Sequence, residues 1–303
     1  MKYLKDFKDK VAVITGGASG IGLGIAKRAV KEGMKVVIAD IDEEALSKAE
    51  VELKELGGTV LSVLTDVSKA EDVETLAQKT LDTFGEVRLL CNNAGVGVGG
   101  LLWEFTLNDW KYVINVNLWG VIHGIRNFVP IMLKQDNECH IVNTASFAGL
   151  TTEPLQGIYN VTKHGVVALS ESLWRELKNE NSKIQVSVLC PGFVNTNILI
   201  TSFQNRQAEL RDREIDEKTA REELLEAHPQ YETYLEMWHR MFEEGLSPDK
   251  AGDIVFEAVK DEAFYILTDT SFMWKRMVKR RLDRVLKAFK TNKPYTRETI
   301  EVF

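Results

Sequence analysis

The sequence predicts an α/β protein with a doubly wound parallel sheet of about seven strands, helices on both faces and a helical insertion. Short apolar runs alternate with longer amphipathic stretches, as expected when a crossover helix follows each parallel strand. The runs are apolar throughout, which indicates strands buried on both faces. Seven runs have this character: VAVIT at 11, VVIAD at 36, LSVLTD at 61, RLLCNNAG at 88, HIVNTAS at 140, QVSVLCPG at 185 and FYILTD at 264.

The chain is long enough for one large domain, and we expect a single domain over residues 1–303. No internal repeat or low-complexity linker divides it. The alternation stops over about 195–247, where strands vanish and charge rises, so we expect a helical insertion there. Its apolar side chains recur at helical spacing. They either pack on the core or form a lid over an apolar ligand, and one helix can do both. They are Tyr231, Tyr234, Leu235, Trp238, Met241 and Phe242.

A basic helical tail is expected over about 271–303. Within it, residues 274–290 read WKRMVKRRLDRVLKAFK, in which basic and apolar side chains alternate at helical spacing. Such a helix packs on the body or on a second subunit, or lies on an anionic membrane surface. We favour the packed helix over the membrane-bound one.

The overall charge and the cysteine count exclude several classes of protein. A formal net charge of −7 and a pI of about 5.5 argue against general affinity for nucleic acid. Three cysteines without CxxC spacing indicate neither a disulfide framework nor a zinc site, and five histidines show no metal-ligand spacing. The start, MKYLKDFKDK, lacks the apolar core of a signal peptide. We therefore expect a cytoplasmic protein without a metal.

A glycine-rich turn follows the first strand. Residues 15–22 read TGGASGIG and open into a helix, so the backbone can approach a phosphate at the helix N-terminus. The next strand ends at Asp40, 18 residues beyond Gly22, where a carboxylate accepts hydrogen bonds from a ribose 2′-hydroxyl. A carboxylate there also repels a 2′-phosphate. The turn therefore predicts a dinucleotide site for NAD rather than NADP.

Further motifs follow in a characteristic order: DV at 66, NNAG at 92, NVNLWG around Asn117, NTAS ending in Ser146, YNVTK at 159 and PGFVNT at 191. Together with TGGASGIG and Asp40, this ordered set resembles the short-chain dehydrogenase/reductase family over residues of about 10 to 196. The resemblance implies a Rossmann-like fold and an NAD-dependent oxidoreductase that interconverts a secondary alcohol and a ketone.

Tyr159 and Lys163 lie four residues apart, so a helix would place them on one face. The resemblance implies that Tyr159 is the general acid/base. Its ordinary pKa is near ~10, and the charges of Lys163 and of the oxidised nicotinamide would lower it. Ser146 would orient the reacting oxygen, and Asn117 would hold a water in a proton relay to the lysine. An asparagine can also sit in a helix merely to satisfy local backbone groups, which is the alternative for Asn117.

The resemblance also implies a set of cofactor contacts. Asp66 would accept from the adenine amino group, although a turn residue before VSKAED is the alternative for this position. The full set is Thr15, Gly16, Ser19, Gly20, Ile21, Gly22, Asp40, Asp66, Val67, Asn93, Ala94, Gly95, Tyr159, Lys163, Pro191, Gly192, Val194 and Thr196.

Apolar residues flank the expected site and no cation is positioned among them, so we expect an uncharged, largely apolar alcohol or ketone, hydroxysteroid-, terpenoid- or aliphatic-like. They are Trp103, Phe105, Phe147, Leu150, Leu155, Ile158, Phe193 and Ile198. A non-catalytic protein that senses a dinucleotide on the same fold is the alternative. The resemblance further implies a homodimer or homotetramer.

Overall fold

The computed structural model describes residues 4–198, 226 and 228–291. Seven strands form one parallel sheet in the order β3-β2-β1-β4-β5-β6-β7. This order confirms the predicted doubly wound sheet, because the strand order reverses beside β1. The strands are β1 (Val11–Thr15), β2 (Lys35–Asp40), β3 (Thr59–Leu64), β4 (Leu89–Asn92), β5 (Cys139–Thr144), β6 (Ile184–Cys190) and β7 (Tyr265–Leu267).

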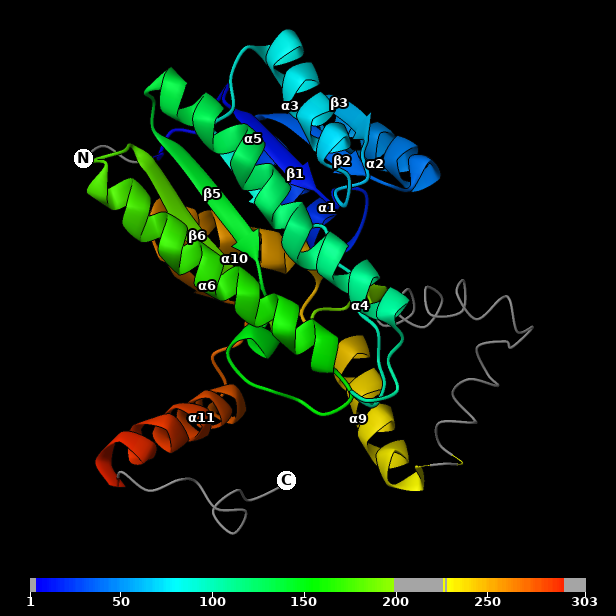
Figure 1. The fold of residues 1–303 in the computed structure, drawn as a ribbon. Helices are drawn as coiled ribbons and strands as arrows, with labels where there is room; N and C mark the ends of the chain where they lie inside the picture. Colours follow the sequence, from blue (N-terminus) through cyan, green and yellow to red (C-terminus); the bar gives the residue numbers. More distant parts are fainter. Residues whose placement is uncertain (1–3, 199–225, 227, 292–303) are drawn as a thin grey trace. The chain divides into compact units, whose positions relative to one another are not determined.

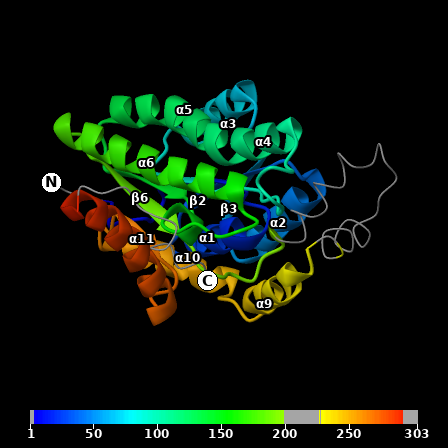
Figure 2. The same ribbon diagram turned by 60° about the horizontal axis from the view of Figure 1, so that its bottom comes forward.

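Helices cover both faces of the sheet (Figure 1). One face carries α1 (Gly20–Lys31), α2 (Glu43–Glu55) and α10 (Pro248–Lys260), and the other carries α3 (Ala70–Phe84), α5 (Gly120–Gln135) and α6 (Gly157–Asn179). Figure 2 shows α3, α5 and α6 together on one side of the strands, with α1 and α10 on the other. The shorter elements are α4 (Leu107–Ile114), the π-helix η1 (Asn115–Trp119), the 3₁₀ turns η2 (Phe147–Gly149) and η4 (Pro229–Tyr231), and α9 (Glu232–Glu243).

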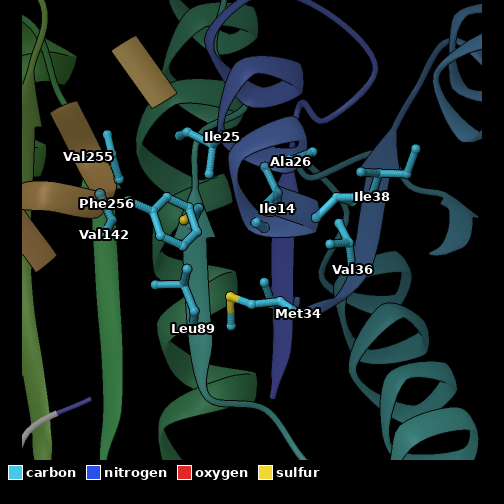
Figure 3. Close-up of a cluster of buried hydrophobic side chains, with 14 of the residues drawn as sticks. Ile14, Ile25, Ala26, Met34, Val36, Ile38, Leu89, Val142, Val255 and Phe256 are labelled. Carbon is cyan, nitrogen blue, oxygen red and sulfur yellow. The ribbon is translucent and has the colours of Figure 1, made fainter. Parts of the chain in front are cut away.

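Alternate residues of the central strands enter two separate cores. Ile14 and Ile38 lie in one cluster with Ile25 and Ala26 of α1 and with Phe256 of α10, and Figure 3 shows Ile38 beside Ala26. Val13 faces the other way and joins the cluster beneath α3, α5 and α6. This double burial explains why the strands read as continuous apolar runs rather than as alternating ones.

The described chain divides into two compact units, Met1–Thr268 and Asp269–Phe303. The second contains α11 (Phe272–Thr291), so the helix expected in the basic tail is present. The single-domain organisation stays a prediction. Of the expected insertion, η4 and α9 are described, whereas 199–225 and 227 lie outside the described residues. No helix in the described ranges is both long and apolar enough to cross a bilayer.

Candidate active site

The predicted site residues gather at the carboxyl edge of the sheet. The glycine-rich turn follows β1, Asp40 ends β2, Asn93 follows β4, Ser146 follows β5 and Pro191 follows β6. In a parallel sheet these ends share one edge, and ligands bind where the strand order reverses. Here that point lies between β1 and β4, which are neighbours in the sheet.

The turn between β1 and α1 has the backbone geometry that a phosphate site requires. Gly16 and Gly20 have φ angles of +62° and +49°, which side-chain-bearing residues rarely adopt. A Cβ on Gly22 would lie 1.9 Å from the carbonyl oxygen of Gly16, so only glycine fits there. Ser19 caps α1 without a side-chain hydrogen bond, and the first turn of α1 contains no acidic residue. The N–H groups at this helix end therefore suit an anion.

Asp40 braces the same turn. Its Oδ2 accepts a hydrogen bond from the backbone N–H of Ala18 at 3.1 Å, and its Oδ1 accepts from that of Ile41 at 2.8 Å. The carboxylate is thus held beside the glycine turn while remaining partly exposed. Its spare lone pairs can accept from ribose hydroxyls.

A hydrogen-bond network joins the ends of the three central strands. Thr15 Oγ1 accepts from the backbone N–H groups of Asn93 and Ala94 at 2.9 and 3.1 Å. The amide of Asn93 donates to the carbonyl of Thr15 and accepts from the hydroxyl of Thr144. A Cβ on Gly95 would lie 3.4 Å from both Asn117 Oδ1 and Lys163 Nζ, so this strand end approaches the catalytic candidates closely.

Asp66 and Val67 lie just beyond β3. Asp66 Oδ1 accepts from the backbone N–H and the hydroxyl of Ser68 at 3.0 and 2.6 Å, and Oδ2 lies 3.5 Å from Lys69 Nζ. Asp66 therefore does act as a turn residue, and its Oδ2 can still accept a further hydrogen bond. Val67 is buried, and its carbonyl lies 2.9 Å from His123 Nδ1.

The segment after β6 is anchored on both sides. The carbonyl of Pro191 accepts from the N–H of Phe147, and the N–H of Gly192 donates to Thr268 Oγ1, each at 3.0 Å. Val194 is buried and bridges to Leu246. The side chain of Thr196 lies against Gly20, since a Cβ built there would be 3.1 Å from Thr196 Cγ2. The segment thus closes over the glycine turn.

Ser146, Tyr159 and Lys163 come together in one place. Ser146 caps η2 and its hydroxyl accepts from the N–H of Ala148 at 3.1 Å. Tyr159 and Lys163 lie one turn apart near the start of α6, and Lys163 Nζ lies 5.4 Å from the centre of the tyrosine ring. The same ammonium donates to the carbonyl of Thr144 at 2.9 Å and is 2% exposed.

Asn117 lies in the π-helix η1 rather than in a regular α-helix, a detail that the sequence did not predict. Its amide donates to the carbonyl of Val96 at 2.8 Å and to Thr162 Oγ1 at 3.2 Å, and its Oδ1 accepts from the N–H of Val96 at 2.8 Å. The side chain therefore ties the loop after β4 to α6. A π-turn also leaves the local backbone pattern irregular, as often occurs at functional sites.

Burial controls the pKa values at the centre of the site. Burial raises the pKa of the Tyr159 phenol to about 12, and a side-chain hydrogen bond with Ser146 acts in the opposite direction. Burial lowers the pKa of Lys163 to about 8. Desolvation by the surrounding protein therefore opposes the lowering that is expected from Lys163 and the oxidised nicotinamide.

Sequence reasoning missed Glu153, which lies in the loop between Ser146 and Tyr159. Its Oε1 is buried with no hydrogen-bond partner among the described residues, and burial raises the pKa of its carboxyl to about 7. The amide of Asn160 donates to its backbone carbonyl at 2.8 Å. The only available signal was a carboxylate inside an otherwise uncharged stretch, TTEPLQG.

Some apolar residues expected to face the substrate instead build the core. Ile158 is fully buried, and Phe105 packs in the same cluster with Val98 and Val113. Phe193 has different neighbours: its ring lies 5.6 Å from that of Trp238 and 5.1 Å from that of Phe242 on α9. Part of the predicted stripe therefore packs on the segment that follows β6.

A parallel sheet with a glycine turn at its reversal point defines the dinucleotide-binding class of α/β folds. The family model for short chain dehydrogenase matches residues 10–207 of this chain. The chain therefore belongs to the short-chain dehydrogenase/reductase family, as its motifs predicted.

Individual relatives extend this likeness over most of the chain. A short chain dehydrogenase/reductase from Burkholderia phymatum, solved in complex with NAD, has a TM-score of 0.83 and 40% identity, covering 97% of this chain and 100% of that one. The CLA biosynthesis dehydrogenase/reductase of Lactiplantibacillus plantarum is 35% identical over 89% of this chain and 91% of its own length. The 1-deoxy-11-beta-hydroxypentalenate dehydrogenase of Streptomyces exfoliatus is 39% identical over 62% of this chain and 68% of its own.

Proposed function

We propose that this protein is an NAD(H)-dependent oxidoreductase that interconverts a secondary alcohol and a ketone. The observation that carries the proposal is the convergence of Ser146, Tyr159 and Lys163 beside the glycine turn. Family membership supports it, because the relatives are named as dehydrogenases and reductases.

Tyr159 takes the hydroxyl proton from the alcohol, or returns a proton to the ketone oxygen in the reverse direction. NAD supplies the hydride acceptor, and NADH the hydride donor, when the cofactor is bound. Ser146 hydrogen-bonds the reacting oxygen and favours the phenolate of Tyr159. Lys163, near the tyrosine ring, adds positive charge and is within the region where the nicotinamide ribose would be held. The backbone carbonyl of Asn117 holds the water of a proton relay to Lys163.

The residues around the turn fit a dinucleotide. The N-terminal end of α1 would hold the pyrophosphate, and Asp40 would hold the adenosine ribose. Asp66 and Val67 would contact the adenine. Asn93, Ala94 and Gly95 would border the adenosine ribose, and the segment from Pro191 to Thr196 the nicotinamide carboxamide. The carboxylate of Asp40 favours NAD over NADP because it repels a 2′-phosphate. The NAD complex of the Burkholderia phymatum relative supports this preference.

The substrate is an uncharged, largely apolar alcohol or ketone. The aromatic contacts of Phe193 with Trp238 and Phe242 support this class, because they add apolar surface to the segment that would border the nicotinamide. On this proposal, α9 forms part of the lid expected over 195–247, of which residues 199–225 and 227 lie outside the described residues. The three cysteines are free and buried, which suits a cytoplasmic protein. We further propose a homodimer or homotetramer, because members of the family commonly form these assemblies.

The decisive experiment measures NADH formation with excess NAD across secondary alcohols ranging from short aliphatics to hydroxysteroids. It includes a carboxylate-bearing hydroxy acid, because one relative is named for 1-deoxy-11-beta-hydroxypentalenate. Turnover of bulky apolar alcohols, lost by about 10²- to 10⁴-fold in Tyr159→Phe, is the expected result. Tyr265→Phe is the matched control, because that tyrosine lies in β7, outside both the catalytic group and the insertion.

Two outcomes would contradict the proposal. Turnover of the hydroxy acid alone would overturn the uncharged substrate class while leaving the chemistry intact. Tight NADH binding without any turnover that depends on Tyr159 would instead favour a dinucleotide-sensing protein.

A further inference from the structure

The helix α11 has an apolar stripe along one side. Trp274, Val278, Leu282, Val285 and Phe289 follow one another at intervals of four, four, three and four residues. At about 100° per residue, these intervals confine the five side chains to roughly a quarter of the helix circumference. We call these five residues the α11 stripe.

The rest of the circumference of α11 carries charge of almost one sign. Residues 272–291 contain eight Lys and Arg and one Asp, Asp283, which pairs with Lys279. The other 283 residues hold 30 Lys and Arg against 44 Asp and Glu, a formal net charge of −14. Positive charge is therefore concentrated on this helix, while the remainder of the chain is acidic.

The C-terminal half of the α11 stripe is exposed. Leu282 is 49% exposed, Val285 51% and Phe289 84%, and the adjacent Leu286 is 57% exposed. Single exposed apolar side chains are ordinary, but several on one face of a helix mark an interaction surface. The basic side chains beside this face indicate that the partner is anionic.

In place of the packed helix favoured from the sequence, we propose that α11 binds the surface of an anionic lipid bilayer. The exposed part of its stripe, Leu282, Val285 and Phe289, would insert at the boundary of the headgroups, and its basic side chains would lie at the lipid phosphates. A helix that exposes Leu, Val and Phe on one face and carries Lys and Arg around it has the composition of an interfacial helix. A helix that docks on a folded protein more often carries charges of both signs, matched to local partners. The near-absence of acidic residues on α11 thus favours a uniformly anionic surface.

The acidic remainder of the chain does not prevent this binding. Charges more than about 10 Å apart are largely screened at 0.1 M salt, so only acidic residues within that distance of the bilayer would oppose binding. Attraction acts on the basic groups that reach the surface itself. Binding should therefore depend on α11 and weaken as salt rises.

The test is co-sedimentation of the full-length protein with vesicles of neutral phosphatidylcholine and with vesicles that also contain about 30% phosphatidylserine. We expect binding to the anionic vesicles only, and a loss of about tenfold in affinity for Phe289→Ser. Phe272→Ser is the matched control, because Phe272 is also strongly exposed, at 77%, but lies off the stripe. Replacing Arg276, Arg281 and Arg284 by Gln should abolish the difference between the two kinds of vesicle.

Thermal unfolding and light scattering complete the test. Unchanged unfolding midpoints would show that the variants fold, so that a loss of sedimentation reports binding. Equal binding of wild type and Phe289→Ser would overturn the proposal. Failure of the wild-type protein to sediment with anionic vesicles would also overturn it. If light scattering then showed an oligomer that dissociates in Phe289→Ser, the stripe would be assigned to contact with a second copy of the chain.

Discussion

The ammonium of Lys163 lies 5.4 Å from the centre of the Tyr159 ring and donates to the carbonyl of Thr144, the last residue of β5. A cation is thus held beside the phenol by the sheet rather than by a neighbouring carboxylate. No counter-anion neutralises the ammonium in these contacts, so its field remains available to the phenol.

Replacing Lys163 by Met should lower turnover while raising the stability of the fold at pH 6. We expect turnover to fall by at least about 10²-fold, because the variant loses the charge that favours the phenolate. Burial holds the pKa of Lys163 at about 8, below its ordinary value, so folding disfavours the charged form. At pH 6 that cost is fully present, and it disappears as pH rises toward the ordinary lysine pKa. The unfolding free energy of the variant minus that of wild type should therefore be more favourable at pH 6 than at pH 9.5. Chemical denaturation at the two pH values measures this difference. A uniform loss at both pH values would contradict this account.

Ser146→Ala should shift the pH dependence of alcohol oxidation. The hydrogen bond with Ser146 lowers the pKa of Tyr159, so its loss should move the rising limb of the pH–rate profile to higher pH. The measurement is kcat against pH in the oxidation direction, where the deprotonated tyrosine is required. Ser146→Thr, which keeps a hydroxyl, is the control. A lower rate with an unmoved limb would assign Ser146 to substrate orientation alone.

Asp40→Asn should change cofactor preference. The amide retains an oxygen that can accept from Ala18 or Ile41 but removes the charge that repels a 2′-phosphate. We expect the ratio of kcat/KM for NADP to that for NAD to rise by about tenfold, the equivalent of about 1.4 kcal/mol. Asp42→Asn, at the exposed N-cap of α2, should leave the ratio unchanged. The same rise in both variants would indicate a general charge effect.

His140 should make the fold acid-sensitive. Its Nε2 lies 2.7 Å from Ser187 Oγ, which donates to the carbonyl of Ala263, and burial lowers its pKa to about 3. Between its ordinary pKa and pH 3, only the unfolded state takes up the proton. Stability should therefore fall on acidification by up to about 1.4 kcal/mol per pH unit from this residue. His140→Gln should show a shallower dependence in urea denaturation from pH 7 to pH 4. An equal slope would assign the acid sensitivity to other groups.

Glu153 should make the fold less stable as pH rises, whereas His140 makes it less stable as pH falls. The pKa of its carboxyl is raised to about 7 by burial, so the folded state holds a proton that the unfolded state releases above its ordinary pKa. The stability that this residue contributes is present at low pH and is lost as pH rises through 7. Glu153→Gln should therefore be more stable than wild type at pH 8.5 relative to pH 4. Unfolding free energies that change in parallel would show that Glu153 is not protonated in the fold.

The sequence alone determined the sheet and the order of the motifs. Buried parallel strands must be apolar on both faces, so runs such as VAVIT and VVIAD predict them locally, without knowledge of their neighbours. The glycine turn was equally local, because the clash of any Cβ at Gly22 with the carbonyl of Gly16 arises within a few residues. Helical periodicity likewise placed Tyr159 and Lys163 on one face of α6.

Only the tertiary structure decided what surrounds these groups. The pKa of Tyr159 depends on burial by segments far apart in the chain, which opposes the lowering expected from nearby positive charges. Sequence patterns likewise did not indicate the buried, unpartnered Oε1 of Glu153 or the π-helix η1, in which Asn117 bonds to Val96 beyond β4. Ile158 entered the core whereas Phe193 met α9, although both are simply apolar in the sequence. Desolvation and side-chain packing depend on contacts between distant residues, and local patterns do not specify them.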